Sequence, residues 1–513
     1  MKRLGANGRP LAIVRQLGPL LGPVLLATAP ILSLFAHNES DIALSLIWKP
    51  LAIAALTAGV LYAISLIIVK RGTRAAVLTS VVTVAFFYYG PFYNTTSGWS
   101  LPHATLLPLW LTLFALGVFG VLRARSGLRN VALILGAAAA VSIVSPVVRI
   151  VAYRIEHPAV RTSDSRLWPT PVPKPVGTQG GTRPDVYYII PDDYARADTL
   201  KKSFGYDNSG FIRQLRARGF AIQDQVRSPY SKSEFNMASA LNLDYLNRLP
   251  KVLGQDSQDV LLVRKMIDDS RASHFLKSLN YRYIHLDSDN ITFGADNPHL
   301  SPLAAPDNLT YQWLRGTLLR EFDGGLGFSQ VATDERFRQS VRSAFKKLVA
   351  TAAVPSPKFV VFHTLLPHDP YIFGPRGQSV RFPDQSDTGH STRRGIKFYV
   401  KQLEFLNQKL LQTVDAISAH AKTPPIIVIQ SDEGFEARPE DFGEAAVRDI
   451  RVKGLSAFHL PGKNAARPPR DLNTVNTFRF LFDRYFGAHL GPLRGATHPE
   501  GDAPYRFEEM PVR

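Results

Sequence analysis

The stretch PPIIVIQSDEGF, residues 424–435, decides the fold of the second half of this chain. A short run of β-branched and apolar residues leads directly into Ser431, Asp432, Glu433 and Gly434. An apolar run of this length that stops at turn-forming residues is typical of a buried strand. The pattern therefore predicts a strand that carries two adjacent carboxylates at its carboxyl end.

Similar apolar runs recur along the second half of the chain, and helical patterns lie between them. The strand candidates are residues 186–190, 281–286, 358–363, 425–430 and 455–460. In residues 393–417 and 334–349, apolar side chains recur at three- and four-residue steps, which is the pattern of a core-facing helix. Strands that alternate with long helices predict an α/β domain with a mostly parallel central sheet.

The first part of the chain contains five apolar stretches of about 20 residues, which is the length that a helix needs to span a bilayer. They lie near residues 17–36, 44–69, 75–93, 104–122 and 130–152. The net charge of +18 over 513 residues would suit a nucleic-acid binder. However, many basic residues flank the apolar stretches, and there is no basic motif with interleaved aromatic residues. We therefore expect a lipid bilayer, and not a nucleic acid, as the partner.

Basic residues also predict how the spans are oriented. Lys and Arg precede the first stretch and follow the second and the fourth, at Lys2, Arg3, Arg9, Arg15, Lys70, Arg71, Arg74, Arg123, Arg125 and Arg129. The connections at 37–41 and 93–103 contain none. By the positive-inside rule the N-terminus is cytoplasmic and the part after the fifth span is extracytoplasmic, either periplasmic or at the cell surface. The first stretch would also fit a cleaved signal peptide, but the others still predict a multi-pass protein of the plasma (inner) membrane.

The predicted organisation has four parts. Residues 1–154 form a multi-span α-helical membrane domain, and residues 155–184 form a linker rich in Pro, Gly, Ser and Thr. Residues 185–490 form the extracytoplasmic α/β domain, and residues 491–513 form a C-terminal tail. The chain has no cysteine, so neither a disulfide framework nor a thiolate metal site can form.

Polar side chains follow three of the predicted strands. Asp192 and Asp193 come after the strand at 186–190, His363 and His368 come at and after the end of 358–363, and Asp432 and Glu433 come after 425–430. Taken singly, each could belong to an ordinary turn or loop. The acids of HLDSDN (285–290) could supply a further ligand, but we favour a loop interpretation for them. Ligands of open α/β sheets bind at the carboxyl ends of the strands, so the joint pattern predicts one site there.

Ser233 is the candidate nucleophile. It stands in SPYSKSEFNMASALN (228–242), where a loop with a proline leads into a helical pattern. A serine at this place could simply cap the helix. In the functional interpretation, the positive end of the helix favours an alkoxide and an incoming anion, which makes Ser233 a metal-activated nucleophile.

These residues resemble the sulfatase-like branch of the alkaline phosphatase superfamily, the group that includes sulfatases, lipoteichoic acid synthase and phosphoethanolamine transferases. The similar blocks run in order through most of 185–490. They are PDVYYIIPDDYAR, SPYSKSEFNMASALNLDYL, FHTLLPHDPY, IQSDEG and NTVNTFRFLFDRYFGA. Several spans followed by an exported catalytic domain also look like the membrane-bound transferases of this group. The resemblance implies an alkaline phosphatase/sulfatase-like fold for the α/β domain.

The resemblance also implies roles for individual residues. Asp192 matches the first metal-binding acid of the family, and Ser233 falls where the family has its Thr, Ser or modified Cys nucleophile, which also contacts the metal. His368 matches a histidine that contacts the transferred group, and His363 lies in the same block. Asp432 matches the metal-binding acid of the Asp-His-Gly signature.

The chain departs from the family at two places. Glu433 replaces the histidine of that signature, and Asp193 replaces the glycine that commonly follows the first acid. Asp192, Ser233, Asp432 and Glu433 would form an oxygen-only set, with Asp193 as a further candidate, and such a set suits Mg²⁺, Mn²⁺ or Ca²⁺ better than Zn²⁺. A site that has lost activity could show the same changes.

The expected activity is metal-dependent transfer of a phosphoryl-alcohol or related group from a lipid-linked donor to a cell-envelope glycan, through a seryl intermediate. Hydrolysis of a phosphate or sulfate ester, with water as the acceptor, is an alternative. Another is a catalytically silent sulfatase-like protein that acts as a binding or assembly module. The sequence does not decide between an active enzyme and a relative that has lost activity. The answer depends on whether Glu433 still supports a metal site.

Overall fold

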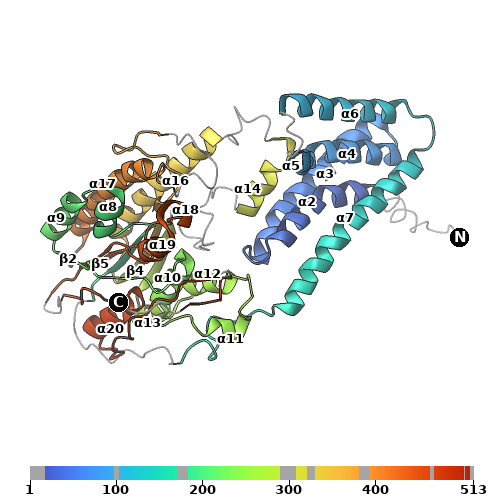
Figure 1. The fold of residues 1–513 in the computed structure, drawn as a ribbon. Coiled ribbons are helices and arrows are strands. Elements are labelled where there is room, and N and C mark those ends of the chain that lie inside the picture. The colour runs from blue at the N-terminus through green and yellow to red at the C-terminus, as the bar shows by residue number, and fades with distance from the viewer. Residues whose placement is uncertain are drawn as a thin grey trace. The chain divides into compact units, whose positions relative to one another are not determined.

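The computed structural model describes residues 18–96, 103–169, 183–288, 308–319, 330–380, 392–462, 467–501 and 503–508. The chain divides into two compact units, which are drawn in Figure 1. The first comprises Met1–Ala159 and Ala304–Thr333, and the second comprises Val160–Leu303 and Asp334–Arg513.

The first unit is a bundle of apolar helices. Its elements are η1 (Gly18–Leu20), α2 (Leu21–His37), η2 (Leu44–Ile47), α3 (Trp48–Val69), α4 (Gly72–Phe87), α5 (Tyr89–Thr96), α6 (His103–Arg123), α7 (Leu128–Glu156) and α14 (Asn308–Arg315). Large apolar side chains such as Leu56, Ile67 and Val141 stay exposed on this unit. Exposed apolar faces on long helices suit contact with lipid chains.

Each of the five predicted spans falls on helix where the structure describes it. Three helical segments are long and apolar enough to cross a membrane: Leu44–Val69, Thr105–Arg123 and Leu128–Glu156. The pair Gly72–Phe87 and Tyr89–Thr95 passes the same test together but is bent by 51°, and the apolar helix Leu21–His37 has only 17 residues. The described helices thus supply three spans, or four if the bent pair crosses as one, and the predicted count of five stays a prediction.

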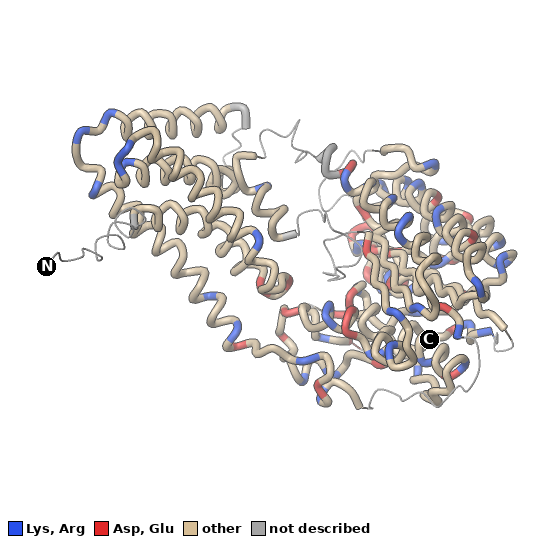
Figure 2. The backbone as a smooth tube through the Cα atoms, turned by 180° about the vertical axis from the view of Figure 1, so that it is seen from behind, with Lys and Arg blue, Asp and Glu red and all other residues tan. Residues whose placement is uncertain are grey.

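The basic connections between these helices lie at the same end of the first unit. Figure 2 shows Lys and Arg at the α3–α4 and α6–α7 connections. The guanidinium of Arg74, in the first turn of α4, donates to the carbonyl of Ala124, just after α6, over 2.5 Å. Two connections that both carry positive charge therefore share one end of the bundle, which is the pattern that the positive-inside rule requires.

The second unit is built on a six-stranded sheet of order β2-β6-β5-β1-β4-β3. The strands are β1 (Val186–Asp192), β2 (Phe220–Ile222), β3 (Arg282–Asp287), β4 (Lys358–Pro367), β5 (Ile426–Gln430) and β6 (Ser456–His459). β5, β1, β4 and β3 are parallel. β6 pairs antiparallel with β5, and β2 pairs antiparallel with β6. The predicted fold class, a multi-span helical region followed by an α/β domain with a mostly parallel sheet, is confirmed. β2 was not predicted from the sequence.

Helices cover both faces of this sheet. They are α8 (Ala197–Phe204), α9 (Ser209–Ala217), α10 (Ser233–Asn242), α11 (Leu249–Leu253), α12 (Leu261–Asp268), α13 (Arg271–Ser278), α16 (Gln330–Ala350), η5 (Thr351–Ala353), α17 (Ile396–His420), α18 (Pro439–Phe442), α19 (Glu444–Arg451), η6 (Thr474–Asn476) and α20 (Thr477–Phe486). The predicted helices at 393–417 and 334–349 correspond to α17 and α16.

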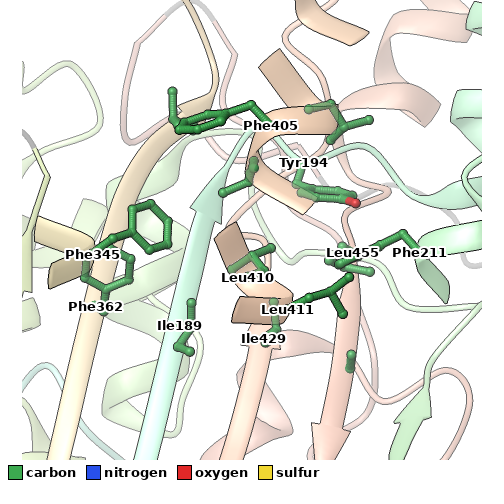
Figure 3. Packing of buried hydrophobic residues seen from close by; sticks show 14 of the residues in the cluster. Ile189, Tyr194, Phe211, Phe345, Phe362, Phe405, Leu410, Leu411, Ile429 and Leu455 are labelled. Carbon is green, nitrogen blue, oxygen red and sulfur yellow. The ribbon is translucent and has the colours of Figure 1, made fainter. Parts of the chain in front are cut away.

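Alternate residues of each central strand enter two separate cores. Ile189 packs with α17 in one core, which Figure 3 shows together with Phe362 of β4 and Ile429 of β5. Tyr188 and Ile190 enter the other core, against α10, α12, α13 and α20. Because successive side chains of a strand point to opposite faces, a strand covered on both sides must be apolar throughout. This burial explains the uninterrupted apolar run of β5.

The segment after residue 490 is tied to the loop that precedes α10. The backbone N–H of His498 donates to the carbonyl of Pro229 over 2.6 Å, and that of Ser231 donates to the Glu500 carboxylate over 3.0 Å. Tyr505 is fully buried in the α10 core. Residues 497–500 therefore hold the loop that leads to Ser233.

Candidate functional site

The site lies where the parallel strands end. β1 ends at Asp192, β3 ends at Asp287, and β5 runs directly into Asp432. His363 lies inside β4, in register with Ile190 of β1 and with Asp287 of β3. Four neighbouring parallel strands thus present titratable side chains at one edge of the sheet, as expected for a ligand site of an α/β fold.

Three of these side chains form a compact group. Asp192, His363 and Asp432 are all buried, and one possible ligand atom from each lies within 4.8 Å of the others. His363 Nε2 is 3.7 Å from Asp192 Oδ2 and 3.8 Å from Asp432 Oδ2. Asp432 Oδ2 is buried and has no hydrogen-bond partner among the described residues. Two carboxylates and an imidazole facing one point are a donor set that fits a divalent cation.

Ser233 lies beside this group, and its hydroxyl does not cap the helix. It is the first residue of α10, the N-cap is Lys232, and no described side chain makes a capping hydrogen bond to this helix. Ser233 Oγ donates toward Glu433 Oε1 at 3.0 Å and toward Asp192 Oδ1 at 3.2 Å. The structure therefore favours the functional interpretation of this serine over the capping interpretation.

Two glycines set the path of the loop that follows β5. A Cβ on Gly434 would lie 2.0 Å from the carbonyl oxygen of Ile450, and a Cβ on Gly454 would lie 2.8 Å from that of Glu433. Neither contact is possible for a larger residue without moving backbone. The close approach of these segments fixes Asp432 and Glu433 at the end of the strand.

Asp193 stands next to the group and is strained. Its φ of 62° is in the left-handed region, where a residue with a Cβ is disfavoured. Its backbone N–H donates to Asp432 Oδ1 over 3.3 Å, and its carbonyl accepts from the Tyr399 hydroxyl over 2.8 Å. Its Oδ1 is buried and finds no hydrogen-bond partner in the part of the chain that the structure describes. The backbone of Asp193 thus orients Asp432, whereas its carboxylate gains little from its place in the fold.

The histidines carry positive charge into this acidic site. Burial disfavours the charged form of His363, but Asp287 and Asp192 outweigh this effect and raise its pKa well above the usual range. Burial likewise opposes the charged form of His368, but its hydrogen bonds to Asp369 and Glu436 raise its pKa well above the usual range. His368 lies in the loop after β4, with Nδ1 3.2 Å from Asp369 Oδ1 and Nε2 3.6 Å from Glu436 Oε2.

The carboxylates respond differently to the same surroundings. Burial alone would raise the pKa of Asp192, but the hydrogen bond and charge of His363 lower it, with help from His368. Burial and the charge of Asp192 raise the pKa of Asp432 to about 7. Burial, followed by the charge of Asp432, raises the pKa of Glu433 well above its usual range. Opposite shifts in neighbouring carboxyls are typical of functional sites.

Two residues of the site were not assigned from the sequence. Asp287, in the stretch that was read as a loop, lies with its Oδ1 3.4 Å from His363 Nδ1. Glu436 contacts His368 and Arg451. Asp287 lies on β3 and His363 lies on the neighbouring strand β4. The order of strands in a sheet cannot be read from a single sequence. Its place directly after an apolar run was the available signal.

Replacing Asp287 with Asn is expected to weaken divalent-metal binding about 10- to 100-fold, because a carboxylate that holds a ligating histidine raises its basicity and fixes its orientation. Isothermal titration of the full-length protein with Mn²⁺ measures this change. Asp256→Asn, at an exposed carboxylate paired with Arg506, is the matched control and should leave the affinity unchanged. Equal affinities in Asp287→Asn and the parent would remove Asp287 from the site.

Replacing Asp193 with Gly is expected to stabilise the metal-free protein by about 1 kcal/mol or more, because glycine adopts positive φ without a Cβ penalty. Asp193→Ala keeps the Cβ and removes only the buried carboxylate, so comparing the two variants separates backbone strain from charge burial. Thermal unfolding of chelator-treated protein in detergent measures both. A lower midpoint for Asp193→Gly than for the parent would contradict the strain argument.

The stability of the metal-free protein is expected to fall as the pH rises from about 4 to about 7. In this interval the unfolded chain releases the proton of Asp432, whose ordinary pKa is about 4, while the folded chain keeps it because its pKa is about 7. The folded state then binds more protons than the unfolded state, so raising the pH favours unfolding. Midpoints of chelator-treated protein at pH 5 and pH 7.5 check the sign, and Asp432→Asn should flatten the dependence.

No protein-family model matches the chain, and no curated protein is significantly similar to it. Similarity to solved structures is found over large parts of the chain. One is the C-terminal periplasmic domain of EcEptC from Escherichia coli in complex with zinc, with 12% sequence identity over 66% of this chain and 96% of that one and a TM-score of 0.42.

Two further solved structures are similar over different lengths. One is the integral membrane protein lipooligosaccharide phosphoethanolamine transferase A (EptA) from Neisseria meningitidis. Its sequence is 13% identical over 86% of this chain and 88% of that one, and the TM-score is 0.34. A 2-O GAG sulfatase is 13% identical over 60% of this chain and 72% of that one, with a TM-score of 0.36.

Proposed function

We propose that this chain is a membrane-anchored, metal-dependent enzyme of the sulfatase-like kind. It transfers a phosphoryl-alcohol or related group from a lipid donor to a cell-envelope glycan through a covalent intermediate on Ser233. The observation that carries the proposal is the placement of the Ser233 hydroxyl, which begins α10 and lies 3.0 Å from Glu433 Oε1 and 3.2 Å from Asp192 Oδ1. A nucleophile needs a proton acceptor within hydrogen-bond reach, and two are present.

Asp192, His363 and Asp432 are the residues that would hold the metal. Their ligand atoms converge, and the buried Asp432 Oδ2 accepts no hydrogen bond from any residue that the structure describes. When bound, a divalent cation would neutralise the transferred group and lower the pKa of the serine hydroxyl. Because the set now includes an imidazole, Mn²⁺ and Zn²⁺ fit it as well as the oxygen-preferring Mg²⁺ and Ca²⁺.

The first chemical step would be made by Ser233. Its Oγ forms a bond to the phosphorus or sulfur of the donor, the bond from that atom to the leaving oxygen breaks, and the Oγ proton passes to Glu433. Burial suits Glu433 to this task, because it raises the pKa of this carboxyl well above that of an exposed glutamate. The N-terminus of α10 favours the negative charge that develops.

His368 would serve the leaving and entering groups. Its raised pKa favours the protonated imidazole, which would give a proton to the leaving oxygen. In the second step an acceptor hydroxyl attacks the seryl ester, His368 takes the hydroxyl proton, and Ser233 leaves with the proton held by Glu433. Both protons return to their starting places, and the enzyme is regenerated.

The anchor supports a lipid as the donor. Three helical segments of the first unit are long and apolar enough to span a bilayer, and the charge of their connections predicts that the α/β domain is extracytoplasmic. A catalytic domain tied to the bilayer surface encounters lipid headgroups at high effective concentration. A glycan of the envelope is the acceptor available on the same side.

The proposal is tested with full-length protein in detergent, a lipid donor with a labelled headgroup, and a panel of divalent metals. Transfer of the label to an added glycan supports the transferase. Release of the label to water at a rate independent of glycan would identify an ester hydrolase. Glu433 in place of the family histidine favours a catalytically silent binding module, and absence of both turnover and a Ser233 adduct with every metal would establish that alternative.

A further inference from the structure

The chain of the α/β domain is interrupted by a segment that belongs to the membrane bundle. Ala304–Thr333 is part of the first unit, whereas the segments before and after it, Val160–Leu303 and Asp334–Arg513, form the second unit. The helix of this inserted segment is α14, and Figure 1 shows it beside α2. Besides the connection that follows α7, the α/β domain therefore has a second link to the bundle.

Two buried side chains dock α14 in the bundle. Leu309 is fully buried, and Trp313 is 4% exposed. The Trp313 indole stacks on Phe87 of α4, with ring centres 5.6 Å apart and planes inclined by 13°. Both side chains belong to one apolar cluster, to which α2 and α3 contribute Ile31, Phe35, Ala54 and Ala58. α14 thus completes the core of the bundle at this place and does not merely lie on its surface.

A close backbone contact fixes the end of the inserted helix. The backbone N–H of Gly90, in α5, donates to the carbonyl of Gly316 over 3.0 Å. A Cβ on Gly90 would lie 2.4 Å from that carbonyl oxygen, so any side chain there would push the two segments apart. Glycine permits this close approach because it has no Cβ. The docking therefore has one defined geometry in addition to its apolar contacts.

α14 docks at one particular end of the bundle. Phe35 lies near the end of α2, Ile47 directly precedes α3, and Phe87 is the last residue of α4. The connection between α3 and α4, which carries Lys70 and Arg71, lies at the opposite ends of these two helices. By the positive-inside rule, α14 thus docks on the side that is predicted to be extracytoplasmic. This is the side that is also predicted for the domain from which the inserted segment comes.

We propose that the docked α14 is a second attachment, which holds the α/β domain to the membrane bundle without the covalent connection after α7. Apolar side chains that are removed from water into a packed core favour the docked state. A chain cut after α7 would then remain a complex of residues 1–158 with residues 159–513, and no free α/β domain would be released. This inference does not rest on the proposed function, because attachment requires no turnover.

The test is a full-length protein with a site for a sequence-specific protease inserted between Pro158 and Ala159, which are both exposed. This position precedes the part of the connection that packs on the second unit, such as the buried Leu167, so that part remains in the larger fragment. Membranes that contain the protein are cut, washed with about 1 M salt to screen attraction between surface charges, and sedimented. We expect residues 159–513 to stay with the membranes, and in detergent to copurify with a tag on residues 1–158.

Two variants disturb the docking from opposite sides of the contact. Trp313→Ala truncates the buried ring and should shift the equilibrium about a hundredfold or more toward the released fragment. Gly90→Ala adds a methyl group against the Gly316 carbonyl and should shift it about tenfold or more. The matched controls are Trp48→Ala, at an exposed tryptophan, and Gly59→Ala, where a Cβ would meet no atom within 4 Å. Both controls should retain the fragment.

Three outcomes would overturn the proposal. The first is release of the fragment from the cut parent, and the second is retention in both docking variants, because another contact would then hold the domain. The third is release by Trp313→Ala but not by Gly90→Ala, which would show that α14 inserts into lipid and does not dock on the bundle. Uncut variants should elute from a sizing column like the parent, so that release after the cut reports docking and not unfolding. If one variant aggregates before the cut, the other decides.

Discussion

Replacing Ser233 with Ala is expected to reduce turnover of a phosphodiester substrate by about a thousandfold or more, because losing a nucleophile removes the covalent route altogether. Divalent-metal binding should change little, since Asp192, His363 and Asp432 remain in place. Ser278→Ala, at a helix surface where the hydroxyl donates to the carbonyl of Phe275, is the matched control and should retain full activity.

Detection of a covalent adduct distinguishes a nucleophile from a residue that only helps to bind the substrate. The parent protein, stopped during turnover and digested, should carry the transferred group on the peptide that contains Ser233, and the variant should carry none. Full activity of Ser233→Ala, or an adduct on another residue, would show that the chemistry takes place elsewhere. A variant that is inactive and no longer binds metal would point to a damaged fold and calls for Ser233→Thr, which keeps a hydroxyl.

Replacing Asp432 with Asn is expected to abolish stabilisation of the protein by divalent metal. At a metal concentration about a hundredfold above its dissociation constant, the parent should gain about 2.7 kcal/mol of unfolding free energy, and the variant should gain almost none. Without metal, the order of the two stabilities reverses, and the variant should be the more stable protein above pH 7. The reason is that the parent has a buried Asp432 carboxyl with a pKa of about 7, which must ionise in this pH range, whereas the variant has none.

Thermal unfolding with and without Mn²⁺ measures both effects in one series. Asp471→Asn, at an exposed aspartate, is the matched control and should behave like the parent. Adding Glu433→Gln to Asp432→Asn tests whether Glu433 replaces the lost ligand. Metal-induced stabilisation that survives in this double variant would contradict the proposed metal site.

The positions of the acids at the strand ends could be predicted because they follow from local pattern. A buried parallel strand must be apolar throughout, so the first polar residues after it mark its carboxyl end, and Asp192 and Asp432 were placed in this way. The strand candidates match β1, β3, β5 and β6 within two residues at each end, whereas β4 runs past the predicted end at residue 363 to Pro367. β2 was missed because Phe220–Ile222 is too short to show a pattern.

The features that depend on tertiary contacts could not be predicted. The Asp287–His363 pair requires β3 to lie beside β4, although the two strands are far apart in sequence. α14 looks like any short amphipathic helix, and nothing in residues 308–315 indicates that it packs with α2 and α3 in the first unit. Likewise, no local signal shows that Glu500 binds the backbone of Ser231.

The contact between residues 497–500 and the loop before α10 also orders events during biosynthesis. Ser231 and Glu500 are 269 positions apart, and every strand of the sheet is translated before Glu500. The loop that leads to Ser233 therefore gains these partners only after the membrane helices and the whole sheet have left the ribosome. A nascent chain can form its sheet before this loop gains its last partners, so we expect a half-made protein in the bilayer not yet to act on its surroundings.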